Sequence, residues 1–242
     1  MSPNRDVSPW YWLIVPLVCS AAYVIILVHQ EVLLWWSNGW LAANGEFGVL
    51  ETAQVVVMVC AIAAGITVLR LQRNVSVPGL RIWATIVLIG CLYILGEEIS
   101  WGQHYLGWAT PQWYAKFNYQ QETNLHNLHS GWFIFKPRAL LEAFIVIGVC
   151  VRPLWRRLRK APGHPPTCLS YWVWPTHVCT AAAGLVIIAS ITKRVDKAFG
   201  LQLFRIIGLD YGEFREFGIY CFTLFYLWSI TIRLKDRITT SQ

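Results

Sequence analysis

The chain has 242 residues, of which 56% are hydrophobic and 14% are charged, and its formal net charge is +7. So many apolar and so few charged residues exclude an ordinary soluble domain and indicate an integral membrane protein. In such a protein the excess of Lys and Arg sets the orientation and contacts membrane lipids, so we expect no nucleic-acid partner.

Six apolar segments approach or reach the length that a transmembrane helix needs, which is roughly 20 residues. They cover residues 10–28, 47–69, 80–101, 139–154, 171–192 and 214–232. The third is an apolar run to Leu95 with a polar extension, and the fourth is the shortest. We therefore predict one all-α domain over residues 1–242, a polytopic membrane helix bundle of about six transmembrane helices.

The basic residues predict the orientation. Lys and Arg are concentrated before the first span and after the second, fourth and sixth, where the only acidic residues are Asp6 and Asp236. Because positively charged loops stay in the cytoplasm, we expect both termini to be cytoplasmic. The remaining acidic residues then lie on the non-cytoplasmic side, where the connections 97–138 and 198–209 have the aromatic or amphipathic character of interfacial segments.

Two adjacent carboxylates, Glu97 and Glu98, lie where the third apolar run meets the membrane surface. Ionisable groups at such a depth persist when a partner or a function compensates for their cost. Adjacent helical residues point about 100° apart, so both cannot face the bundle centre. We predict that Glu98, with Gly102 on its face, points into the bundle and that Glu97 meets loop amides or a basic residue.

A second group of polar side chains lies further along the same connection. Glu122 and His126 are four residues apart, and His126 and His129 are three apart. On a helix all three would project from one face and could converge on one ion. Because carboxylates and imidazoles are common metal ligands, this spacing predicts a metal site.

Three further acids are predicted at the same depth. Glu51 begins the second span, and Glu213 and Glu216 begin the sixth, where a helix N-terminus also favours negative charge. Such acids can also be solvated or paired with nearby Lys and Arg residues. We expect one cluster, formed by Glu51, Glu98, Glu122, His126 and Glu213. Carboxylates gathered at low dielectric need protons, bases or a cation.

The string Glu-Glu-Ile-Ser-Trp-Gly-Gln (97–103), followed by Glu-x-Asn-Leu-His-Asn (122–127), resembles an uncharacterised family of bacterial multi-pass membrane proteins. The acidic starts of the second and sixth spans are also similar to that family. The resemblance implies the bacterial inner membrane. It also implies Arg at the position of His104, which argues against His104 as a ligand. It brings no assigned activity.

The leading hypothesis is a metal-dependent membrane enzyme, a hydrolase or transferase, with its site at the non-cytoplasmic surface. The predicted metal ligands are Glu98, Glu122, His126, His129 and Glu216, and the predicted catalytic groups are Glu98, Glu51 and Glu213. A divalent ion (Zn, Fe or Mn) would acidify a water and polarise an ester, amide or phosphate bond. A site at this surface suits a lipid or lipid-linked substrate.

Two functions without catalysis stay open. One is an accessory subunit of a membrane protein complex, whose many aromatic residues pack against partners. The other is a cation- or proton-coupled transporter, in which glutamates at the membrane edge bind and release ions. The transporter is less favoured because no predicted span is broken near its middle by Gly or Pro, and no repeat occurs.

Overall fold

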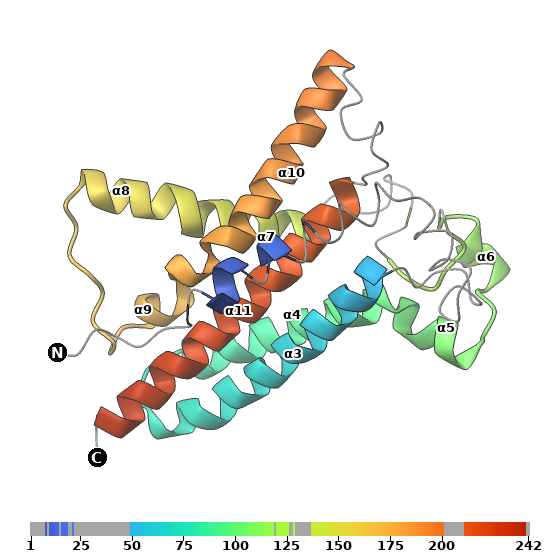
Figure 1. The fold of residues 1–242 in the computed structure, drawn as a ribbon. Coiled ribbons are helices and arrows are strands. Elements are labelled where there is room, and N and C mark those ends of the chain that lie inside the picture. The colour runs from blue at the N-terminus through green and yellow to red at the C-terminus, as the bar shows by residue number, and fades with distance from the viewer. Residues whose placement is uncertain are drawn as a thin grey trace.

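The computed structural model describes residues 8, 10–14, 16–18, 21, 49–118, 120–125, 128, 137–200 and 211–240. Helices and their connections make up these residues, with no β-strand among them and one isolated β-bridge between Asn118 and Leu128. The predicted all-α class is therefore confirmed. Figure 1 shows the helices gathered into one elongated bundle.

Four long helices form most of the bundle: α3 (Val49–Leu71), α4 (Leu80–Glu98), α10 (Thr180–Phe199) and α11 (Tyr211–Thr240). A fifth helical stretch runs without interruption through α7 (Pro137–Val146), the π-helical turn η5 (Ile147–Val151) and α8 (Arg152–Leu158). The remaining elements are short: η1 (Trp10–Ile14), η3 (Gln72–Asn74), η4 (Ser100–Gly102), α5 (Gln103–Leu106), α6 (Gln112–Ala115), α9 (Leu169–Val173) and η6 (His177–Cys179).

Four described segments are long and apolar enough to cross a membrane: Thr52–Asn74, Leu80–Glu98, Leu169–Phe199 and Phe214–Thr240. They correspond to the second, third, fifth and sixth predicted spans, and they support an integral membrane protein. The first predicted span, 10–28, lies mostly outside the described residues. The fourth, 139–154, falls on α7, η5 and α8, which are not among the four, so the number six stays a prediction.

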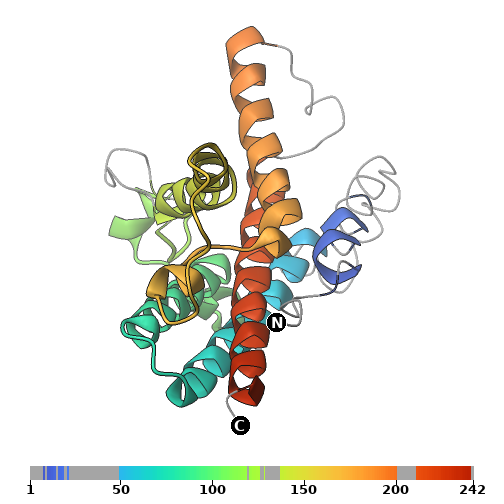
Figure 2. The same cartoon turned by 90° about the vertical axis from the view of Figure 1, so that its left-hand side faces the viewer.

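Helix α11 is the centre of the packing. In the most apolar stretch of α11, 83% of the residues are buried, against 28% in the corresponding stretches of α3 and of α4. Figure 1 shows α11 crossing the middle of the bundle, and Figure 2 shows η1 and the α7–α8 stretch on opposite sides of it. The outer helices instead expose apolar residues at helical spacing, as Ile82, Ile86 and Ile89 do on α4. Such a face suits contact with lipid.

The two ends of the bundle differ in charge. The start of α3, the end of α4 and the start of α11 lie at one end, together with α5 and α6 (Figure 1). The turn between α3 and α4 and the C-terminus lie at the other end. The first end therefore carries the predicted glutamates, and the second carries Arg70, Arg73, Arg81, Arg233 and Arg237.

Candidate functional site

A left-handed turn ends α4 and begins the acidic end of the bundle. Ser100, Trp101 and Gly102 have φ angles of 47°, 57° and 92°. Gly102 adopts this conformation freely, but each of the other two costs about 1–2 kcal/mol. Strain of this kind persists only where the surroundings hold it in place, and the contacts of the neighbouring Glu97 do so.

Glu97 ties this turn to the following connection. Its side chain is only 5% exposed. One carboxylate oxygen accepts the indole N–H of Trp101 at 2.7 Å, and the other accepts the backbone N–H of Leu125 at 2.7 Å. Burial, and then the charge of Glu97, raise the pKa of Tyr114, whose hydroxyl donates to the carbonyl of Asn124 at 2.7 Å. Glu97 thus holds two distant segments together.

Ser100 and Glu122 form the buried centre of the same region. The Ser100 hydroxyl donates to Glu122 Oε2 at 2.6 Å, and the Asn124 amide donates both to the Ser100 hydroxyl at 2.9 Å and to Glu122 Oε2. Asn118 donates to the carbonyl and side-chain oxygens of Asn124 at 2.8 and 2.9 Å. All four side chains are buried, so these bonds satisfy groups that would otherwise be costly to desolvate.

Gln103 closes the network on its outer side. Its Oε1 accepts the backbone N–H of Thr123 at 2.8 Å and the Thr123 hydroxyl at 2.6 Å, while its Nε2 donates to Thr110 at 2.9 Å. The indole of Trp108 donates to the Thr123 hydroxyl at 3.0 Å. We call residues 97–125 the polar cap. Four residues of the 97–103 string therefore serve to fold this cap.

Glu98 points the other way, into the bundle. Its Oε2 accepts the hydroxyl of Tyr220 on α11 at 2.6 Å. Glu216, which is 8% exposed, lies one helical turn before Tyr220 on the same face of α11. The predicted division, Glu98 inward and Glu97 to a loop amide, is confirmed by these contacts. The predicted shared face with Gly102 is wrong, because α4 ends at Glu98 and Gly102 lies beyond it, in the left-handed turn.

Glu142 on α7 is paired with a basic residue, the alternative that the sequence left open for the acids. Its Oε1 lies 3.4 Å from Nε of Arg215 on α11, and both side chains are partly exposed. An ion pair of this kind contributes at most about 1 kcal/mol. Glu142 therefore links α7 to α11 and is not a member of the candidate site.

The prediction that Glu122, His126 and His129 share one face of a helix is wrong for Glu122, because the chain around it is not helical. Residues 120–125 are not helical, because Asn118 Oδ1 accepts the backbone N–H groups of Gln120 and Glu122 and bends the chain there. The bridge between Asn118 and Leu128 then brings the chain back antiparallel. His126 and His129 lie outside the described residues.

For two other predicted site residues, Glu51 and Glu213, the structure describes the backbone but not the side chain. Glu51 and Glu213 lie in the first turns of α3 and α11, but their side chains are outside the description. Among the side chains that the structure describes, no three His, Cys, Asp or Glu residues gather closely enough to hold a metal ion. Glu98, Glu122 and Glu216 alone therefore do not make the predicted site, and the metal stays a prediction.

Two features of the structure were not predicted from the sequence. The residues around Tyr220 give no indication of its contact, because its partner Glu98 is 122 positions away in the sequence. The second is a cavity at the opposite end of the bundle, lined by Arg152, Arg156 and Arg233. From the sequence we used these residues only for orientation, although the density of arginines after residue 151 was a signal for an anion site.

Family models, curated proteins and solved structures were compared with the chain, and none of them matches it.

Proposed function

We propose that this chain is a multi-pass protein of the bacterial inner membrane with both termini cytoplasmic, and that its acidic end binds a divalent metal ion and acts on a lipid or lipid-linked substrate. The observation that carries the proposal is the Glu98–Tyr220 hydrogen bond. It joins the end of α4 to the first turns of α11, at the end of the bundle where α3 also begins (Figure 1).

The chemistry of the residues fits such an ion. Glu98 is partly buried and Glu216 is buried. They lie on α4 and α11, which the Glu98–Tyr220 hydrogen bond joins. Carboxylates brought together at low dielectric favour a bound cation. In this proposal Glu98 and Glu216 hold the ion with Glu51 or Glu213 and with His126 or His129. The ion would supply an acidified water and a polarised substrate bond.

The polar cap has a positioning role in this proposal. Because Oε2 of Glu122 is engaged by Ser100 and Asn124, we assign Glu122 to holding the connection in place, beside its predicted role as a ligand. That connection continues directly to His126 and His129. Tyr220 orients the Glu98 carboxylate. These side chains would fix the direction from which a lipid head group reaches the site.

Metal content of the purified protein tests the proposal. We expect the wild type to retain Zn, Fe or Mn in stoichiometric amount, and Glu98→Gln and His126→Ala to lose it and to melt at lower temperature. Removal of a ligand that binds only the folded state costs about 2.7 kcal/mol at one hundred times its dissociation constant. His177→Ala, at the opposite end, is the matched control and should retain the metal.

A wild type that carries no metal, and is not stabilised by adding any of the three ions, would refute the metal site. An accessory subunit would then be the better reading. One observation favours it specifically. The surface of the cap exposes Tyr105, Leu106 and Trp113 by 64%, 76% and 68%. Large apolar side chains exposed together mark a contact with a partner or with the membrane.

The orientation has its own test. A reporter that is active only in the periplasm should give signal when it is fused after residue 120, in the polar cap, and none when it is fused after residue 162, in the basic linker. The expectation rests on the excess of Lys and Arg at the second end of the bundle. The reverse pattern would place the acidic end in the cytoplasm and contradict the proposed localisation.

A further inference from the structure

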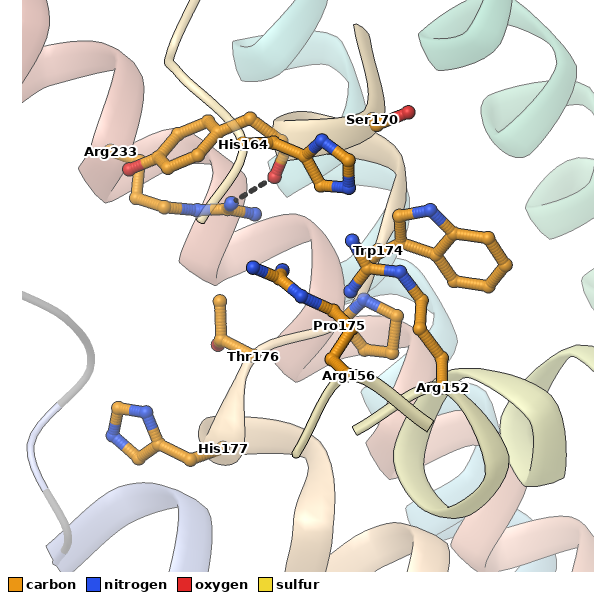
Figure 3. Close-up of a pocket in the computed structure, with 10 residues that line it drawn as sticks. Arg152, Arg156, His164, Ser170, Trp174, Pro175, Thr176, His177 and Arg233 are labelled. Carbon is orange, nitrogen blue, oxygen red and sulfur yellow. Dashed lines mark hydrogen bonds between the residues drawn. The ribbon is translucent and has the colours of Figure 1, made fainter. Parts of the chain in front are cut away.

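A cavity of about 300 Å³ lies at the basic end of the bundle, away from the polar cap. Its wall comes from α8, the linker that follows it, α9 and the segment after it, and α11. Figure 3 shows the guanidinium groups of Arg152, Arg156 and Arg233 directed toward the same space, with His164 and Trp174 beside them. Residues far apart in the sequence therefore bring three positive charges together.

The described residues around the cavity provide no negative charge to balance these arginines. Among the described residues that line the cavity, three are Arg, two are His and none is acidic. Within the described part of the chain, Arg215 pairs with Glu142, and none of the three cavity arginines forms an ion pair there. Because clustered positive charges repel one another, such a site is most stable with an anion bound.

Arg233 supplies the strongest single indication of a ligand. Its side chain is 6% exposed. Nη1 donates to the carbonyl of Tyr171 at 2.8 Å and Nε to that of Ser229 at 3.3 Å, and the guanidinium lies 5.1 Å from the Tyr171 ring centroid. Nη2 is buried and has no hydrogen-bond partner. A buried charged donor without an acceptor is costly, and a bound anion would remove that cost.

The other two arginines are held in place by contacts that leave donors for a ligand. Arg152 lies over the Trp174 ring at 4.8 Å. Arg156 donates from Nη2 to the carbonyls of Ala161 and Pro162 in the linker. Burial, and then the charges of Arg152 and Arg156, lower the pKa of His164, as expected in a positive electrostatic field. An anion in the cavity would offset the effect of those charges on His164.

We propose that this cavity binds a phosphate group. A phosphate presents several oxygens in tetrahedral directions and can accept from three guanidinium groups on separate helices, whereas a carboxylate accepts most naturally from one. The surroundings make a phospholipid head group one source. Leu154, Trp155 and Leu158 of α8 are exposed beside it, and basic pockets at the cytoplasmic membrane surface bind such head groups. A soluble phosphate compound is the other source.

The test uses the full-length protein, delipidated in neutral detergent, in two parallel titrations. One adds a short-chain phosphatidylglycerol, with phosphatidylcholine as the zwitterionic control, and the other adds inorganic phosphate, with succinate as the carboxylate control. Binding is followed by isothermal calorimetry and by the shift in melting temperature. One variant combines Arg152→Gln and Arg156→Gln and leaves the buried Arg233 undisturbed. The control variant is Arg157→Gln, because Arg157 lies on α8 but does not line the cavity.

We expect the double variant to weaken binding at least about tenfold and Arg157→Gln to change it less than about twofold. Saturable binding of phosphatidylglycerol alone would identify a lipid head group as the source, and binding of inorganic phosphate would identify a soluble one. The proposal is overturned by any of three results. The wild type binds neither phosphatidylglycerol nor phosphate, or succinate binds as well as phosphate, or the double variant binds like the wild type. Loss of metal at the opposite end has no bearing on this result.

Discussion

Glu97→Gln is expected to lower the free energy of unfolding by about 2–4 kcal/mol, although the two side chains have nearly the same shape. Each oxygen of the Glu97 carboxylate accepts an N–H, one from Trp101 and one from Leu125. A glutamine amide must place its NH₂ group against one of these donors. The variant therefore loses a hydrogen bond to a charged acceptor and leaves a partly buried N–H without its acceptor, each worth about 1–3 kcal/mol.

Thermal unfolding in detergent, together with limited proteolysis of the polar cap, measures this effect. Glu142→Gln is the matched control, because Glu142 forms a partly exposed ion pair with Arg215 and should cost at most about 1 kcal/mol. We expect proteolysis between residues 103 and 125 to become faster in Glu97→Gln and to stay unchanged in the control. Equal stability of the two variants would show that Glu97 does not hold the cap to α4.

Gly218→Ala should destabilise the bundle by about 1–3 kcal/mol through overpacking between α10 and α11. A Cβ at position 218 would lie 2.9 Å from Cγ2 of Val186 and 3.2 Å from its backbone nitrogen. Val186 is β-branched and only 1% exposed, so it cannot turn away. Glycine is thus required here by the close approach of two helices, as is common in membrane proteins.

Two other glycines are controls for this prediction. A Cβ added at Gly90 on α4 or at Gly184 on α10 would have no atom within 4 Å. Gly90→Ala and Gly184→Ala should therefore leave the melting temperature unchanged or raise it, since Ala favours a helix over Gly by about 1 kcal/mol. If Gly218→Ala melts like these two, then α10 and α11 do not pack as closely as described.

The sequence alone was sufficient for the helices whose apolar runs have clear ends. The run from Leu80 to Leu95 predicted α4, and the run from Tyr171 to Thr192 predicted most of the segment that contains α9 and α10. Composition alone indicated a membrane protein, because apolar residues at this density cannot all be buried inside a chain of this length. The different directions of Glu97 and Glu98 were also predictable, since they follow from the 100° step of a helix.

The roles of the polar residues were decided by tertiary structure. Glu122 and His126 have the spacing of a helical pair, yet Asn118 captures the backbone N–H groups of Gln120 and Glu122, and the segment at Glu122 is not helical. Spacing along a chain predicts a shared face only if the helix forms, and side chains that bond to nearby backbone groups compete with it.

Contacts between distant segments decided the rest. The sequence determined which residues are apolar, where the long helices run and which end of each helix carries acidic or basic groups, because these depend on neighbours along the chain. Only the packing around α11 brought Tyr220 to Glu98 and Arg233 to the arginines of α8. Such pairs are separated by many residues, and their interaction exists only after the helices have packed.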